Sequence, residues 1–170
     1  MSRLHVCSLA RAPDMVRETG ARSLVTLLDA ETPVARPSAI APERHLRLSM
    51  SDIVMALDGH VPPGEAHVAA LVDFTLRWDR AAPMLIHCYA GVSRSTAAAF
   101  IAACALNPAR DEFEIAAVLR QRSPTATPNG RLVALADSML RRKGRMSAAV
   151  REIGRGADCF EGVPFALDLL

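Results

Sequence analysis

A short apolar run that leads directly into a cysteine constrains this chain more than any other feature. Three apolar residues, 84–86, precede His87 and Cys88, which is typical of a buried strand that ends at a reactive group. A loop containing Gly91 follows, and the apolar run 97–106 predicts a helix that begins just before it. The free N–H groups and the dipole of such a helix face the loop, so the pattern predicts an anion-binding site.

The side chains of this loop suit a reaction at a bound anion. Cys88 is a nucleophile as a thiolate, which nearby positive charge stabilises, and Arg94 offers a planar fork of donors to phosphate oxygens. Gly91 lets the backbone curl so that successive N–H groups converge. We expect Ser95 to donate a hydrogen bond to the sulfur and His87 to hold backbone groups around it. Taken singly, these residues could be a core cysteine, a surface charge and a strand-end histidine, but their order favours a site.

The segment His87-Cys88-x-x-Gly91-x-Ser93-Arg94-Ser95 resembles the signature loop of the cysteine-dependent protein tyrosine phosphatases, most closely the dual-specificity branch. The resemblance implies a thiol-phosphate intermediate on Cys88, support of the thiolate by Ser95, and neither a metal nor an organic cofactor. It also implies a phosphate-binding loop made of His87, Tyr89, Ala90, Gly91, Val92, Ser93 and Arg94.

A second local resemblance follows the signature. Residues 119–124, with Pro128 and Asn129 after them, are similar to the helix and Pro-Asn loop of dual-specificity enzymes. In those enzymes the asparagine steadies the signature loop, and the resemblance implies the same role for Asn129. An ordinary turn at this position is the alternative. The resemblance as a whole covers roughly residues 4–142.

Cleavage of a phosphate ester by a thiolate also needs an acid that protonates the leaving oxygen. Asp52 is our first candidate, because it ends an alternating apolar and polar run and because residues 46–52 resemble the general-acid segment of dual-specificity phosphatases. Asp58 is the rival, on a loop that could close over the site, although Asp-Gly is a common turn pair. Asp29 ends another predicted strand and is more typical of a turn.

Alternation of apolar residues predicts strands at 4–9, 23–29 and 43–52, besides the one that leads to Cys88. Helices are expected at 13–20, 65–79, 95–106, 111–122 and 131–142. This order predicts an α/β fold with a central, mostly parallel sheet flanked by helices. We expect one phosphatase domain over 1–170, with 146–170 as a C-terminal extension docked on it and a helix over 147–153. The site should lie beyond the carboxyl end of the strand that delivers Cys88.

Composition bounds the remaining possibilities. With 170 residues, 51% hydrophobic and 22% charged, the chain suits a globular domain rather than a disordered one. A net charge of +2 argues against broad nucleic-acid binding. The four cysteines show no metal-ligand spacing, so no metal site is expected. We find no secretion signal and no run long enough to span a membrane, and a thiolate enzyme needs reducing conditions, so we expect a cytoplasmic location.

These observations predict a phosphatase that acts on phosphate monoesters, first of all protein phosphotyrosine, with phosphoserine, phosphothreonine and small phosphomonoesters as further candidates. Loop positions Tyr89, Ala90 and Val92 carry no lysine, which weighs against a phosphoinositide bearing several phosphates. One alternative is a catalytically silent module that binds phosphopeptides. Others are an arsenate reductase, for which no resolving thiol is well placed, and a rhodanese-like sulfur transferase. The sequence predicts no oligomeric state.

Overall fold

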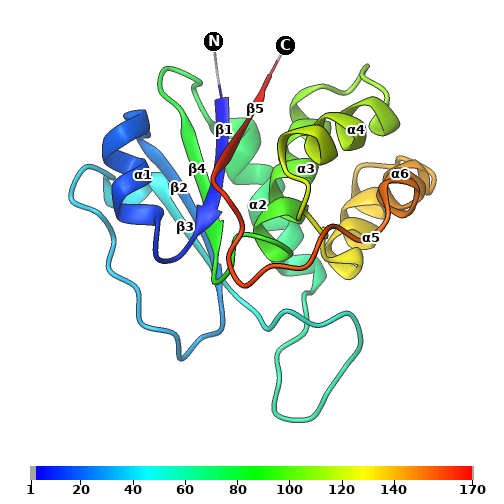
Figure 1. The fold of residues 1–170 in the computed structure, drawn as a ribbon, viewed down its shortest axis with the longest axis horizontal. Coiled ribbons are helices and arrows are strands. Elements are labelled where there is room, and N and C mark those ends of the chain that lie inside the picture. The colour runs from blue at the N-terminus through cyan, green and yellow to red at the C-terminus, as the bar shows by residue number, and fades with distance from the viewer. Residues whose placement is uncertain (1–2, 170) are drawn as a thin grey trace.

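The fold is built on a five-stranded sheet in the order β3-β2-β4-β1-β5 (Figure 1). The computed structural model describes residues 3–169. Strands β1 to β4 are parallel to one another, whereas β5 runs antiparallel to β1. The strands are β1 (Arg3–Ser8), β2 (Ser23–Leu28), β3 (His45–Ser49), β4 (Met84–Cys88) and β5 (Phe165–Asp168). The predicted α/β architecture with a mostly parallel sheet is confirmed.

Helices cover both faces of this sheet. In Figure 1, α1 lies on one side and the other helices gather on the opposite side. The helices are α1 (Ala12–Thr19), α2 (Glu65–Arg77), α3 (Arg94–Leu106), α4 (Glu112–Arg122), α5 (Gly130–Met139) and α6 (Arg145–Ile153). Every residue of α3 except Ala105 is buried, which explains why this helix is apolar on all sides. The central strand β4 is likewise buried at all five positions.

Most predicted elements end within two residues of their predicted ends. The third strand is shorter than predicted, because Pro42 begins a 3₁₀ turn and β3 starts only at His45. Asp52 consequently lies in the loop three residues beyond Ser49 rather than at the strand end. The helix predicted over 131–142 ends earlier, at Met139. Two residues later, the backbone of Arg141 has a positive φ of 55°, which a continuing α-helix does not allow.

The C-terminal residues join the same sheet. In the described part of the extension 146–170, α6 contacts α4 and α5, and β5 contacts β1. Strand β5 pairs with β1 from Arg3 to Val6, which makes it the antiparallel edge of the sheet. A strand was not predicted here, because only four residues follow Pro164 before the strand ends.

A buried ionic cluster joins the helices behind the sheet. Glu112 at the start of α4 accepts hydrogen bonds from Arg142 (2.7 Å) and Arg145 (3.1 Å). Arg142 also donates to the carbonyl oxygen of Cys104 in α3 at 2.7 Å. Both Glu112 and Arg142 are buried, so each charge depends on the other for compensation.

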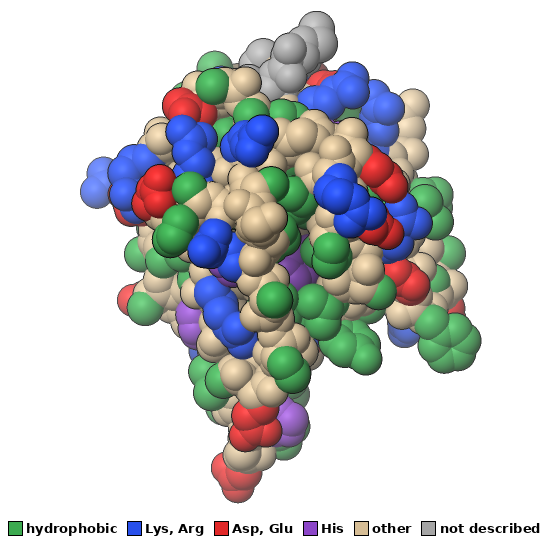
Figure 2. Space-filling view, turned by 90° about the vertical axis from the view of Figure 1, so that its left-hand side faces the viewer, with side chains coloured by type: hydrophobic (Ala, Val, Ile, Leu, Met, Phe, Trp, Pro, Cys, Tyr) green, Lys and Arg blue, Asp and Glu red, His purple; other side chains and the backbone are tan. Residues whose placement is uncertain are grey.

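The surface carries charges of both signs. Figure 2 shows basic side chains (Lys and Arg) interspersed with acidic ones on the side of the molecule that bears α1. Among residues 3–169, no helix is long and apolar enough to cross a membrane.

Candidate active site

The loop 89–93 connects the end of β4 to the start of α3 at the carboxyl edge of the sheet (Figure 1). Gly91 has a φ of 74°, a conformation that residues with a Cβ adopt only with strain. A Cβ at this position would also lie 2.7 Å from the carbonyl carbon of Cys7. The tight approach of the loop to β1 therefore requires glycine here.

Cys88, the last residue of β4, is buried directly before this loop. Its Sγ lies 3.1 Å from Oγ of Ser95, and the backbone N–H of Gly91 donates to it at 3.3 Å. These two groups can stabilise a thiolate by donating to it. By contrast, burial raises the pKa of the Cys7 and Cys104 thiols to about 12, so both remain protonated at neutral pH.

Two nitrogen atoms of the Arg94 guanidinium differ in their hydrogen bonding: Nη1 has partners, whereas Nε has none within the described structure. Its Nη1 donates to the carbonyl oxygen of Met50 at 2.8 Å and lies 3.4 Å from Oδ2 of Asp29. Its Nε is buried and has no hydrogen-bond partner within the described structure. Such an N–H group is costly to leave unpaired.

Asp29, at the end of β2, is more typical of a turn residue by sequence, yet its carboxylate lies 3.4 Å from Nη1 of Arg94. A hydrogen bond from Ser51 and the nearby Arg94 guanidinium hold the pKa of the Asp29 carboxyl below its usual value. The position of Asp29 directly after β2 could have indicated its place at the site, because the carboxyl ends of adjacent parallel strands meet at the same edge of a sheet.

Asp52 lies against the loop, whereas Asp58 does not. Oδ1 of Asp52 accepts hydrogen bonds from Oγ of Ser93 at 2.7 Å and from Nδ2 of Asn129 at 2.9 Å. Asp58 lies in an exposed turn closed by the bond from His60 N–H to the carbonyl oxygen of Leu57. Within residues 3–169 no hydrogen bond joins Asp58 to the loop. This arrangement favours Asp52 of the two candidate acids.

Asn129 links three parts of the site. Its Oδ1 accepts from the N–H groups of Arg131 and Leu132 and so caps α5. Its Nδ2 donates to Asp52, and its backbone N–H donates to the carbonyl oxygen of Ser93 at 3.2 Å. Asn129 therefore contacts both the candidate acid and the loop.

His87 is held beneath the loop by a chain of hydrogen bonds. Oγ1 of Thr26 lies 2.8 Å from Nε2 of His87 and 2.9 Å from Nε2 of His45. Nδ1 of His87 lies 3.4 Å from the carbonyl oxygen of Cys88, which assigns the ring proton to Nδ1 and makes Thr26 the donor to Nε2. Burial lowers the pKa of His87 to about 4, so the ring is neutral at pH 7.

The loop carries no charged side chain between Cys88 and Arg94. Tyr89 is 66% exposed, and Ala90 and Val92 flank the glycine. A hollow of about 600 Å³ beside Asp52 is lined by residues 52–57 and 127–130 together with Ser93. This lining contains no lysine or arginine.

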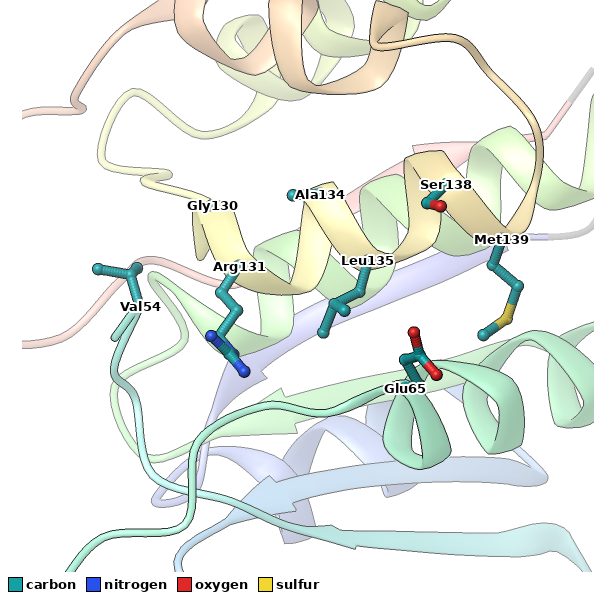
Figure 3. Close-up of a pocket in the computed structure, with 8 residues that line it drawn as sticks. All are labelled: Val54, Glu65, Gly130, Arg131, Ala134, Leu135, Ser138 and Met139. Carbon is teal, nitrogen blue, oxygen red and sulfur yellow. The ribbon is translucent and has the colours of Figure 1, made fainter. Parts of the chain in front are cut away.

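A second hollow lies between α2 and α5 (Figure 3). It has a volume of about 690 Å³ and shares Val54 and Gly130 with the hollow beside Asp52. Figure 3 shows Arg131 and Leu135 of α5 on one side and Glu65 of α2 on the other. Nε of Arg131 donates to the carbonyl oxygen of Pro63 at 2.6 Å, so this cation is already engaged.

No cluster of three or more His, Cys, Asp and Glu side chains within residues 3–169 is arranged to hold a metal ion. The groups around Cys88 can instead bind an oxyanion, supply a nucleophile and supply a carboxyl group.

Comparison with known proteins rests on the fold, since no family model and no curated protein matches the sequence. The Cydia pomonella PTP-2 phosphatase is 20% identical, with a TM-score of 0.62 over 79% of this chain and 84% of that one. Human DUSP28 is 18% identical, with a TM-score of 0.62 over 82% and 92% of the two chains. PTPMT1, solved in complex with PI(5)P, is 14% identical, with a TM-score of 0.62 over 82% and 90%.

These similarities extend over most of each chain, at identities that establish a shared fold. The fold agrees with the resemblance of residues 87–95 to the signature loop. The chain therefore has the fold of the dual-specificity protein tyrosine phosphatases.

Proposed function

We propose that this protein hydrolyses phosphate monoesters through a thiol-phosphate intermediate on Cys88. The observation that carries this proposal is the buried Nε of Arg94, which has no partner in residues 3–169. Met50 and Asp29 hold the other end of the same guanidinium. An arginine that is fixed in this way, beside a cysteine with two hydrogen-bond donors, suits a bound phosphoryl group better than a structural role.

In the first step, the thiolate of Cys88 attacks phosphorus. The S–P bond forms as the bond to the ester oxygen breaks, and Asp52 donates its proton to that oxygen. Arg94 and the N–H groups of the loop stabilise the charge on the equatorial oxygens. In support of this role for Asp52, the hydrogen bonds from Ser93 and Asn129 engage only its Oδ1 within the described structure.

In the second step, water attacks the phosphorus of the intermediate. The Asp52 carboxylate takes the proton from that water, and the S–P bond breaks to release phosphate. Ser95 and the Gly91 N–H, which lie 3.1 and 3.3 Å from Sγ, stabilise the departing thiolate.

The substrate we propose is protein phosphotyrosine. The exposed Tyr89 and the hollow beside Asp52 present apolar groups next to the phosphate-binding loop. A phenyl ester would contact such a surface favourably, whereas a headgroup bearing several phosphates would find no lysine or arginine in this hollow. Phosphoserine, phosphothreonine and small phosphomonoesters are the substrates to compare with it. The thiolate chemistry also suits a reducing, cytoplasmic setting.

The test is hydrolysis of p-nitrophenyl phosphate without added metal, with vanadate as inhibitor. We expect turnover by the wild type, none by Cys88→Ser, and loss of the pH dependence due to the acid in Asp52→Asn. Full turnover by Cys88→Ser would reject the mechanism. Phosphate binding without turnover in the wild type would instead identify a silent binding module. A normal profile in Asp52→Asn with a defect in Asp58→Asn would move the acid to Asp58.

A further inference from the structure

Four of the five carbonyl oxygens of loop 89–93 accept hydrogen bonds from surrounding segments. Tyr89 accepts from Leu9 N–H at 3.1 Å, Val92 from Thr127 N–H at 2.9 Å, and Ser93 from Asn129 N–H at 3.2 Å. In a trans peptide, the C=O and N–H of one unit point in opposite directions. Bonds that draw these carbonyls outward therefore turn the loop N–H groups inward.

The fourth tie comes from the C-terminal segment 154–163, between α6 and β5. The N–H of Gly162 donates to the carbonyl oxygen of Ala90 at 2.9 Å. The same peptide unit, Ala90–Gly91, carries the N–H that donates to Sγ of Cys88 at 3.3 Å. One peptide plane thus connects the C-terminal segment to the candidate nucleophile.

The segment approaches the loop too closely for any residue except glycine at 162. A Cβ there would lie 2.8 Å from the carbonyl oxygen of Gly91 and 3.4 Å from Cγ2 of Val92. Beside it, the Glu161 carboxylate accepts from Oγ of Ser8 at 2.5 Å, and Ser8 is the residue of β1 that pairs with Cys88. The backbone of Gly162 is therefore in direct contact with the backbone of the loop.

The other end of the segment is anchored independently. Gly156 N–H donates to Oγ1 of Thr127 at 3.0 Å, and Ala157 N–H donates to the carbonyl oxygen of Pro124 at 3.0 Å. Nη2 of Arg120 donates to the carbonyl oxygen of Gly154 at 2.7 Å. The segment is thus fixed at both ends around the point where Gly162 contacts the loop.

We propose that the C-terminal segment 154–163 is a positioning element of the active site, and that Gly162 orients the Ala90–Gly91 peptide so that its N–H stabilises the Cys88 thiolate. The proposal rests on the assignment of Cys88 as the nucleophile. It gives residues beyond the signature region a part in the chemistry, through the backbone of the loop.

The test compares Gly162→Ala with Gly64→Ala, a glycine at the start of α2 where a Cβ would meet only His67 Nδ1 at 3.8 Å. The readout is the rate of Cys88 alkylation by iodoacetamide from pH 5 to 9, followed by mass spectrometry. All variants carry Cys159→Ser, because Cys159 is exposed and would compete for the reagent. The Gly162→Ala change alters no charged or titratable side chain, so it leaves in place those around the site, among them Cys7, Arg11, Asp29, Asp52, His87, Tyr89, Arg94 and Glu161.

We expect Gly162→Ala to move the alkylation profile to higher pH and to slow alkylation at pH 6 by about tenfold, because one hydrogen bond to an ionised sulfur is lost. Vanadate affinity should fall by about tenfold as well, since the loop N–H groups no longer converge. Gly64→Ala should match the wild type in both measurements. An unchanged profile in folded Gly162→Ala would overturn the proposal.

If circular dichroism shows that Gly162→Ala does not fold, Ser8→Ala decides the question. It removes the tether to Glu161 without changing a charge, and we expect a shift in the same direction of about two- to threefold at pH 6. A wild-type profile in Ser8→Ala would then overturn the proposal. Alkylation needs no turnover, so a wild type that hydrolyses no ester would reject the proposed function while this comparison still reports on the segment.

Discussion

Replacing Arg94 by lysine tests whether a fixed guanidinium fork is what the site requires. Nη1 of Arg94 donates to the carbonyl oxygen of Met50 at 2.8 Å, while its Nε is left without a partner in residues 3–169. A lysine ammonium can occupy one of these two positions but cannot span both. It keeps the charge and loses the bidentate geometry.

The size of the loss follows from the bonds removed. Removing one donor from an oxyanion site costs about 10²–10³ in kcat, or about 3–4 kcal/mol. We expect Arg94→Lys to lose about this much in kcat/KM for p-nitrophenyl phosphate. Most of the loss should fall on kcat, because the fork is most needed when charge spreads over the phosphoryl oxygens in the transition state.

The matched control is Arg122→Lys. Arg122 is exposed on α4 and lies 3.4 Å from Asp168, an ion pair of the kind that contributes little in water. Its kcat/KM should stay within about twofold of the wild type. If Arg94→Lys keeps more than about a third of the wild-type kcat/KM, with circular dichroism showing an intact fold, then the bidentate role of Arg94 is wrong.

Three further predictions concern residues around and behind the site. Asp29→Asn removes a half-exposed ionic partner of the loop arginine and should weaken vanadate binding by about two- to fivefold in a titration. Glu112→Ala leaves Arg142 buried without its partner and should cost about 3–5 kcal/mol in urea unfolding, whereas Glu114→Ala on the exposed side of the same helix should cost less than about 0.5 kcal/mol. Burial lowers the pKa of His87 from 6.5 to about 4, so the unfolded chain takes up this proton first as the pH falls. The contribution of neutral His87 to the free energy of unfolding is therefore complete above pH 6.5 and is lost towards pH 4, about 3 kcal/mol in all. In His87→Gln, the free energy of urea unfolding should depend less steeply on pH between 4 and 6.5. An equally steep dependence in this variant would contradict the lowered pKa of His87.

Local sequence patterns predicted most of the fold, because the buried helices and strands consist of long apolar runs or of apolar residues at regular spacing. Strand β4 is apolar up to its end, and α3 is apolar on all sides, so each could be recognised from a few residues. The loop between them was predicted from its own residues, because Cys88, Gly91 and Arg94 lie within seven positions in a recognisable order. These are short-range constraints, and a single sequence displays them.

The partners of the loop could not be predicted in the same way. Asp29 reaches Arg94 across 65 positions of the chain, and Asn129 reaches Asp52 across 77. Asp29 was set aside because an aspartate after a strand is most often a turn residue. Its contact with Arg94 depends on the order of strands in the sheet, which no local pattern of charges or apolar residues reveals.

The C-terminal segment shows the same limit most clearly. Strand β5 has only four residues, and it is stabilised by the exposed edge of β1 rather than by its own pattern. Once that pairing forms, the chain must cross the carboxyl edge of the sheet to reach β5 from α6, and this path brings Gly162 against the phosphate-binding loop. The sheet pairing that closes the fold and the hydrogen bond that orients the Ala90–Gly91 peptide are therefore consequences of one path. A change that weakens β5 should loosen the loop as well, even though no residue of β5 contacts Cys88 through a hydrogen bond in the described structure.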